Sequence, residues 1–156
     1  MASPVVVRLL GSHEAAVLDH VAPDVFDHAV DPRWASEFFA DPRHHLVVAL
    51  EGELVVGMAS GLHYVHPDKA RQLFVNEVGV APTHEGQGLG RRLLETLLAH
   101  GRSLGCVEAW VATELTNERA RRLYLRAGGE ESPDHIVMYT FRMGSQGRVG
   151  GEFEAS

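Results

Sequence analysis

A short glycine-rich turn between a strand pattern and a helix pattern limits what this chain can fold into more than any other feature. Residues 72–80 alternate in the manner of a strand, and residues 89–104 place leucines at helical spacing. Between them, Gly86, Gly88 and Gly90 let the backbone turn sharply and approach a ligand closely. A strand that passes through such a turn directly into a helix aims backbone N–H groups and the positive end of the helix dipole at one point. The sequence therefore predicts an anion site suited to phosphate or diphosphate.

Two widespread nucleotide-binding motifs do not match this turn. A P-loop continues with Lys and then Ser or Thr after its last glycine, but Arg91 and Arg92 follow Gly90 here. The dinucleotide-binding fingerprint places a third glycine three residues after the second, and Arg91 stands three residues after Gly88 instead. A glycine-rich turn that holds no ligand therefore stays open as an alternative at this point.

The rest of the pattern predicts alternating strands and helices. We expect strands over residues 5–10, 45–50, 54–62, 107–113 and 136–141, and helices over residues 15–21, 33–40 and 117–127. Residues 65–71 are expected to form a loop, and strand 72–80 to place Leu73, Val75, Glu77 and Gly79 on one face. This order indicates a mixed α/β (α+β) fold whose sheet is largely antiparallel, with one parallel pair.

Length and composition set further bounds. With 156 residues, the chain has room for one domain, expected over residues 1–142, followed by a Gly/Ser-rich tail over residues 143–156. We see no secretory leader pattern and no apolar run long enough to span a bilayer, so we expect a cytoplasmic protein with no membrane partner. The net charge of −7 argues against non-specific nucleic-acid binding. Cys106 is the only cysteine, which excludes an intrachain disulfide.

The excess of acidic residues is concentrated near the start of the chain. Residues 12–41 contain one basic residue, Arg33, and seven acidic ones: Glu14, Asp19, Asp24, Asp27, Asp31, Glu37 and Asp41. Residues 85–142, by contrast, contain eight acidic and eight basic residues. Two interpretations stay open: a solvated acidic surface, and a wall that faces a cationic ligand.

Two motifs, in this order, resemble the Gcn5-related N-acetyltransferase (GNAT) family. The turn Glu85-Gly-Gln-Gly-Leu-Gly90 is similar to that family's Gln/Arg-x-x-Gly-x-Gly/Ala loop for acetyl-CoA. Downstream, residues 117–128 resemble its Asn-x-x-Ala-x-x-x-Tyr-x-x-x-Gly signature. The resemblance spans roughly residues 4–142 and implies a GNAT fold, in which a splayed parallel strand pair and flanking helices hold acetyl-CoA.

The resemblance also implies which residues bind the cosubstrate acetyl-CoA. These are Val78, Val80, Glu85, Gly86, Gln87, Gly88, Leu89, Gly90, Arg91, Asn117, Ala120 and Tyr124. Glu85 departs from the family, because it stands where Gln or Arg is usual, and a carboxylate beside a diphosphate is electrostatically unfavourable. We expect Arg91 or Arg92 to offset its charge. No histidine grouping completes a convincing set of metal ligands, so no metal is expected.

Acetyl transfer from a thioester to an amine needs a neutral amine and a protonated leaving sulfur. The resemblance points to Tyr124 as the acid, since a tyrosine with a pKa of about 10 stays protonated at neutral pH. Simple packing of Tyr124 against the cosubstrate is the alternative. Glu77 is the candidate base; it could instead orient the acceptor or be purely structural. Asn117 could contact the cosubstrate or only cap its helix.

The acceptor is expected to be a cationic amine. Residues 74–80 and other stretches resemble the aminoglycoside 3-N-acetyltransferases of this family, and aminoglycosides are polycations. We therefore expect acetylation of the 3-amino group of an aminoglycoside, and hence antibiotic resistance, with Asp27, Asp31, Glu77 and Glu114 binding the acceptor. Another amine (a polyamine, an amino-acid derivative or a protein N-terminus) and a non-catalytic CoA-binding module stay open. The resemblance is also compatible with a homodimer.

Overall fold

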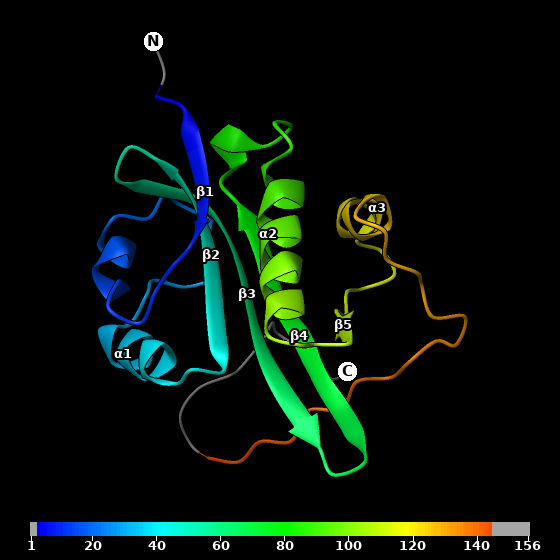
Figure 1. The fold of residues 1–156 in the computed structure, drawn as a ribbon. Helices are drawn as coiled ribbons and strands as arrows, with labels where there is room; N and C mark the ends of the chain where they lie inside the picture. The colour runs from blue at the N-terminus through cyan, green and yellow to red at the C-terminus, as the bar shows by residue number, and fades with distance from the viewer. Residues whose placement is uncertain (1–2, 145–156) are drawn as a thin grey trace.

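The computed structural model describes residues 3–144, which form a five-stranded sheet flanked by helices (Figure 1). The strands follow one another across the sheet in chain order: β1 (Val5–Leu9), β2 (His44–Glu51), β3 (Leu54–His66), β4 (Lys69–Val80) and β5 (Glu108–Trp110). Neighbours are antiparallel from β1 to β4, whereas β5 runs parallel to β4. The predicted mixed α/β sheet with one parallel pair is confirmed.

Helix α2 (Leu89–Ser103) packs against one face of this sheet and supplies much of the core. Its buried leucines recur at helical spacing, as the sequence predicts, and they meet the sheet where glycines make room. An added Cβ at Gly57 would lie 2.9 Å from Leu93 Cδ1, and one at Gly61 would lie 3.3 Å from Leu97 Cδ2. The two glycines of β3 thus let the helix approach the sheet closely.

The segment before β2 packs beside the sheet and reaches β4. It contains a 3-10 helix, η1 (Ala15–Asp19), and helix α1 (Pro32–Ala40), both of which lie beside β1 and β2 (Figure 1). Between them, Val25 is buried and its backbone touches β4. An added Cβ at Gly79 would lie 2.3 Å from the Val25 carbonyl oxygen. Gly79 therefore fixes how closely the acidic early segment approaches β4.

A bulge in β4 decides which of its residues face helix α2. Val75 and Glu77 pair with consecutive residues of β3, so Asn76 is an extra residue without a partner there. Leu73, before the bulge, packs against α2, whereas Gly79, after it, lies against the early segment. Glu77 shares the face of Gly79 because side chains alternate along a strand. The prediction that these alternate residues share one face is therefore wrong.

Two loop and helix predictions also differ from the structure. Residues 65–71 do not form a loop, because β3 and β4 continue as a hairpin in which His66 pairs with Lys69. The Tyr64 hydroxyl donates a hydrogen bond of 2.9 Å to Gln72 Oε1 across these strands. The helix predicted over residues 15–21 is only the short η1, because the backbone that follows it hydrogen-bonds to β3 instead.

The strands predicted near the end of the chain are shorter or missing. Of residues 107–113, only β5 pairs with β4, and the chain then leaves the sheet. Residues 136–141 form no strand, although five of them are large apolar residues with exposed side chains: Ile136, Val137, Met138, Tyr139 and Phe141. Most of the expected tail, from residue 145 on, lies outside the described residues. Within residues 3–144, no helix is long and apolar enough to cross a bilayer.

Candidate active site

A large pocket opens where β4 and β5 separate. The two strands pair only over three residues, from Gln72 opposite Glu108 to Phe74 opposite Trp110, and then diverge. A pocket of about 920 Å³ lies beyond this point, between the end of β4, the turn after it, the N-terminus of α2 and helix α3 (Glu118–Arg126). The fork in the sheet therefore creates a cleft large enough for a nucleotide-sized ligand.

One wall of the pocket is the free edge of β4. The Ala81 N–H donates to the Val56 carbonyl oxygen of β3 at 2.8 Å. Because antiparallel strands alternate between bonded and non-bonded pairs, the N–H and C=O groups of Val78 and Val80 point away from β3, into the fork. These groups can pair with the amides of an extended arm such as pantetheine. Both residues line the pocket, where the sequence predicts them.

The turn after β4 presents backbone N–H groups to the pocket. Gly86 and Gly88 have φ values of +77° and +74°, which side chains rarely allow. No side chain caps the N-terminus of α2, so its first N–H groups keep their hydrogen-bonding capacity. A 3-10 turn, η2 (Pro82–His84), holds this turn in place through a 2.9 Å contact from His84 Nε2 to Glu51 Oε2 of β2. The geometry fits a diphosphate.

Helix α3 supplies the opposite wall. Asn117 Oδ1 accepts a hydrogen bond of 3.1 Å from the Ala120 N–H, so Asn117 caps the helix, as the sequence allows. Asn117, Ala120 and Tyr124 all line the pocket. Tyr124 is partly buried, and this burial raises the pKa of its hydroxyl, which therefore stays protonated at neutral pH.

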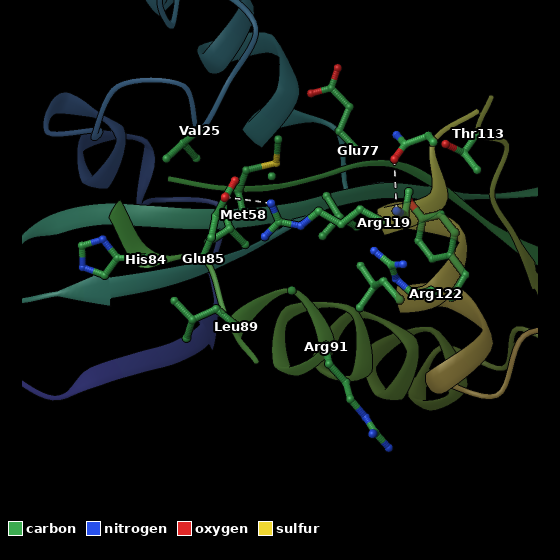
Figure 2. A pocket seen from close by; sticks show the side chains of 18 of the residues that line it. Val25, Met58, Glu77, His84, Glu85, Leu89, Arg91, Thr113, Arg119 and Arg122 are labelled. Carbon is green, nitrogen blue, oxygen red and sulfur yellow. Dashed lines mark hydrogen bonds and ion pairs between the residues drawn. The ribbon is translucent and has the colours of Figure 1, made fainter. Parts of the chain in front are cut away.

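Carboxylates gather on the face of β4 that the bulge turns away from α2. Glu77 (Figure 2) lines the pocket together with Asp27 and Asp24, which both belong to the segment between η1 and α1. Partial burial raises the pKa of Glu77, the negative charge of Asp27 raises it further, and His28 opposes the shift. The pocket thus combines a backbone anion cradle with an acidic wall.

Three of the residues expected at the site do not line the pocket. Asp31 caps α1 and forms an ion pair of 2.8 Å with Arg33, and it does not line the pocket. Glu114 and Gln87 are exposed beside the pocket without lining it. The remaining expected residues, from β4, the turn and α3, are brought together.

The charge of Glu85 is balanced by an arginine of α3, and not by either arginine of α2. Arg91 pairs with Glu95 of its own helix at 2.7 Å, and Arg92 reaches a backbone carbonyl of β1. Instead, Arg119 Nη1 of α3 contacts Glu85 Oε2 at 2.8 Å. The expectation that Arg91 or Arg92 offsets Glu85 is therefore wrong.

Sequence reasoning also missed other pocket residues. Asp24 lines the pocket, although the sequence indicated only that it belongs to the acidic segment. Its φ of +65° could not be predicted from a sequence pattern. Arg119, Arg122 and Arg126 all line the pocket. Their spacing of three and four residues places them on one helical face, and this signal was present in the sequence.

Comparison with known sequences identifies relatives across most of the chain. The model of the acetyltransferase (GNAT) family matches residues 14–129. An uncharacterised N-acetyltransferase of Mycobacterium bovis is 26% identical over 131 residues, which cover 84% of this chain and 78% of that protein. The N-alpha-acetyltransferase RimI of Mycobacterium tuberculosis is 37% identical over 89 residues, which cover 57% of this chain and 54% of that protein.

Solved structures show the same fold. AAC(6')-Iy in complex with the bisubstrate analogue CoA-S-monomethyl-acetylneamine matches with a TM-score of 0.74 at 18% identity, covering 90% of this chain and 100% of that chain. An aminoglycoside acetyltransferase from an uncultured soil metagenomic sample matches with a TM-score of 0.71 at 16% identity, covering 88% and 97%. The name AAC(6')-Iy specifies the 6′ position, whereas the sequence resemblance led us to expect acetylation of the 3-amino group. Together with the family match, these findings show that the chain belongs to the GNAT family of N-acetyltransferases.

Proposed function

We propose that this chain is an acetyl-CoA-dependent N-acetyltransferase that acetylates an amine of a cationic small molecule. The observation that carries the proposal is that one pocket holds both a backbone cradle for a diphosphate and three carboxylates, Asp24, Asp27 and Glu77. The free edge of β4 lies between the cradle and the carboxylates. An acetyl-CoA whose diphosphate binds the cradle can therefore extend its thioester arm along β4 toward an acceptor at the carboxylates.

Two side chains supply the proton transfers of the proposed reaction. Acetyl-CoA supplies an acyl group that is activated as a thioester. Glu77, a better base because its pKa is raised, accepts a proton from the acceptor ammonium, directly or through a water molecule. The neutral amine then forms the C–N bond while the C–S bond breaks, and the nitrogen releases its second proton, which restores the Tyr124 hydroxyl through a water molecule after the hydroxyl has protonated the sulfur. The Tyr124 hydroxyl, protonated at neutral pH, donates its proton to the departing sulfur.

Aminoglycosides are the acceptors we place first. Their several ammonium groups complement three carboxylates on one wall, and the expected acetylation of the 3-amino group remains part of the proposal. A peptide N-terminus is the second candidate, because RimI of Mycobacterium tuberculosis, an N-alpha-acetyltransferase, is among the relatives. The two candidates differ in the number of positive charges presented to the wall.

The experiment is a thiol-release assay with acetyl-CoA and a panel of amines. The panel contains an aminoglycoside, a polyamine, a diamino acid and a peptide with a free N-terminus. The proposal expects free CoA thiol with the polycationic members, and NMR of the product then distinguishes the 3-amino from the 6′-amino group. Turnover on the peptide alone would contradict the cationic acceptor, and no thiol release with any amine would contradict the proposed reaction.

The expected homodimer also stays a proposal. The exposed apolar side chains over residues 136–143 support it, since monomers rarely expose such a continuous apolar segment. Light scattering coupled to size-exclusion chromatography should give twice the chain mass of 17.1 kDa. Removal of residues 136–156 should convert the species to a monomer. A monomer for the full chain would contradict this part of the proposal.

A further inference from the structure

An ion pair joins the two walls of the pocket on its diphosphate side. Arg119 extends from the first turn of α3 toward the turn after β4, where its guanidinium contacts Glu85 (Figure 2). The N···O distance is 2.8 Å, and both residues line the pocket. The pair therefore lies beside the backbone N–H groups that the proposed function assigns to the diphosphate.

The other cations and anions nearby do not compete for this contact. The Arg91 side chain extends away from Glu85 and Arg119 (Figure 2) and pairs with Glu95. Arg121, two residues after Arg119, pairs with Glu131 at 2.7 Å on another side of α3. Glu85 and Arg119 are thus each other's ion-pair partners in the described part of the chain, residues 3–144.

The pair is weak enough to be exchanged. The two side chains are 40% and 61% exposed, and exposed ion pairs add little to stability because water screens them. A diphosphate brings two negative charges and several oxygens, to which a guanidinium can donate two parallel hydrogen bonds. Arg122 and Arg126 extend the cationic face of α3 along the same pocket and favour an anion there.

We propose that Arg119 exchanges the Glu85 carboxylate for a phosphate of the incoming nucleotide, so that the ion pair acts as a strap across the diphosphate site before the nucleotide binds. The inference rests on the proposed function, because the phosphate belongs to acetyl-CoA. Before acetyl-CoA binds, Glu85 holds Arg119 beside the diphosphate site. The negative charge of Glu85 also repels the diphosphate. Arg119 is then a ligand of the nucleotide, and Glu85 sets how readily that ligand becomes available.

The test is the dissociation constant of acetyl-CoA, measured by calorimetry on the full chain. Glu85→Gln removes the competing carboxylate and should tighten binding by about threefold to fivefold, the upper range for an exposed pair. Arg119→Gln removes a charged hydrogen bond to phosphate and should weaken binding by about tenfold. In the double variant, the gain from Glu85→Gln should fall below about twofold, because no arginine remains to be released.

Matched controls separate the exchange from a change in net charge. Glu118→Gln and Arg121→Gln remove one negative and one positive charge from the first turn of α3 without touching the pocket pair, and each should change the dissociation constant by less than about twofold. S-acetyl-pantetheine, which has no phosphate, should bind the wild type, Glu85→Gln and Arg119→Gln equally.

The outcomes distinguish this inference from the function on which it rests. If the wild type binds acetyl-CoA but Glu85→Gln leaves the dissociation constant unchanged or raises it, the exchange is wrong and the proposed function stands. The exchange is also wrong if the controls match the pocket variants. If the wild type does not bind acetyl-CoA, both are wrong.

Discussion

Glu77 is the side chain on which the proposed proton transfer depends most. It lies on the pocket wall that the β4 bulge turns toward Asp27. We predict that Glu77→Gln lowers kcat by about 100-fold, the usual contribution of a general base, because the amide cannot accept the proton. The dissociation constant of acetyl-CoA should not change. Steady-state kinetics and calorimetry check both quantities; an unchanged kcat would assign Glu77 an orienting or structural role.

The pKa of Glu77 gives a second prediction at the scale of residues. Burial and the Asp27 charge raise this pKa, and the base is active only when deprotonated, so kcat should fall as the pH drops through the raised value. Asp27→Asn removes one cause of the shift and should move this acidic limb to lower pH. A pH profile of kcat at saturating acceptor measures the shift. A limb that stays in place would show that the two carboxylates do not interact.

Several of these residues could be predicted from the sequence, for a physical reason. The cradle follows from its glycine spacing between a strand and a helix, whereas Glu77 and Tyr124 were identified through the resemblance to the GNAT family, and all of them line one pocket. Asp24 and Arg119 could not be placed in the same way. The position of Asp24 depends on the path of the early segment. The position of Arg119 depends on its contact with Glu85, which lies 34 residues earlier in the chain.

At the scale of elements, the contact between β4 and the early segment positions the acidic wall. Gly79 leaves room for the Val25 backbone, and alanine there would displace the segment that carries Asp24 and Asp27. We predict that Gly79→Ala costs about 2 kcal/mol of unfolding free energy and raises the KM for the acceptor more than the KM for acetyl-CoA. Gly11→Ala is the control, since its Cβ would make an ordinary 3.6 Å contact. Equal effects of the two variants on the acceptor KM would contradict this role.

A hydrogen-bonded row of histidines joins β2, β3 and α2 away from the pocket. His45 Nε2 lies 2.7 Å from His63 Nδ1, and His100 Nε2 lies 3.0 Å from His45 Nδ1. Burial, then the charges of His100 and His63, lower the pKa of His45 to about 4; His44 adds a smaller lowering effect, and the Asp41 carboxylate opposes the shift. The histidine row is therefore neutral in the folded protein at physiological pH.

This row predicts a loss of stability in acid. Between pH 6.5 and pH 4, a histidine in the unfolded chain, with a pKa of about 6.5, is protonated, whereas folded His45 stays neutral. The free energy of unfolding therefore falls as the pH drops from about 6.5 toward 4. Between pH 7 and pH 5 the loss from His45 should be about 2 kcal/mol. Urea unfolding at the two pH values measures it. His45→Gln should reduce this difference and exposed His135→Gln should not; the same difference in both variants would contradict the assignment.

The elements show where sequence patterns stop being informative. Helix α2 follows from its leucine spacing, and the β2–β3 hairpin follows from two apolar runs. The bulge at Asn76 could not be predicted, because register depends on the partner strand. Residues 136–141 have the pattern of a strand but no partner among residues 3–144, and a strand needs a partner as well as a pattern.

At the scale of the whole molecule, the uneven charge has a structural explanation. The acidic early segment packs against β4, so that two of its carboxylates meet Glu77 in the pocket. Asp31 of the same segment caps α1 and does not line the pocket. The acidic composition of the segment therefore does not by itself predict which carboxylates belong to the pocket wall. Opposite, the arginines of α3 line the same pocket beside the cradle. The pocket is thus cationic along α3 and acidic along the early segment.

The central claim is that this acidic wall selects a polycationic amine for acetylation. The most direct measurement compares kcat/KM for an aminoglycoside with kcat/KM for a peptide with one amine, in the wild type and in an Asp24→Asn, Asp27→Asn double variant. We predict that the wild type prefers the aminoglycoside, and that the double variant loses about tenfold or more of this preference while its KM for acetyl-CoA stays the same. A wild type that prefers the peptide, or a preference that survives both substitutions, would contradict it.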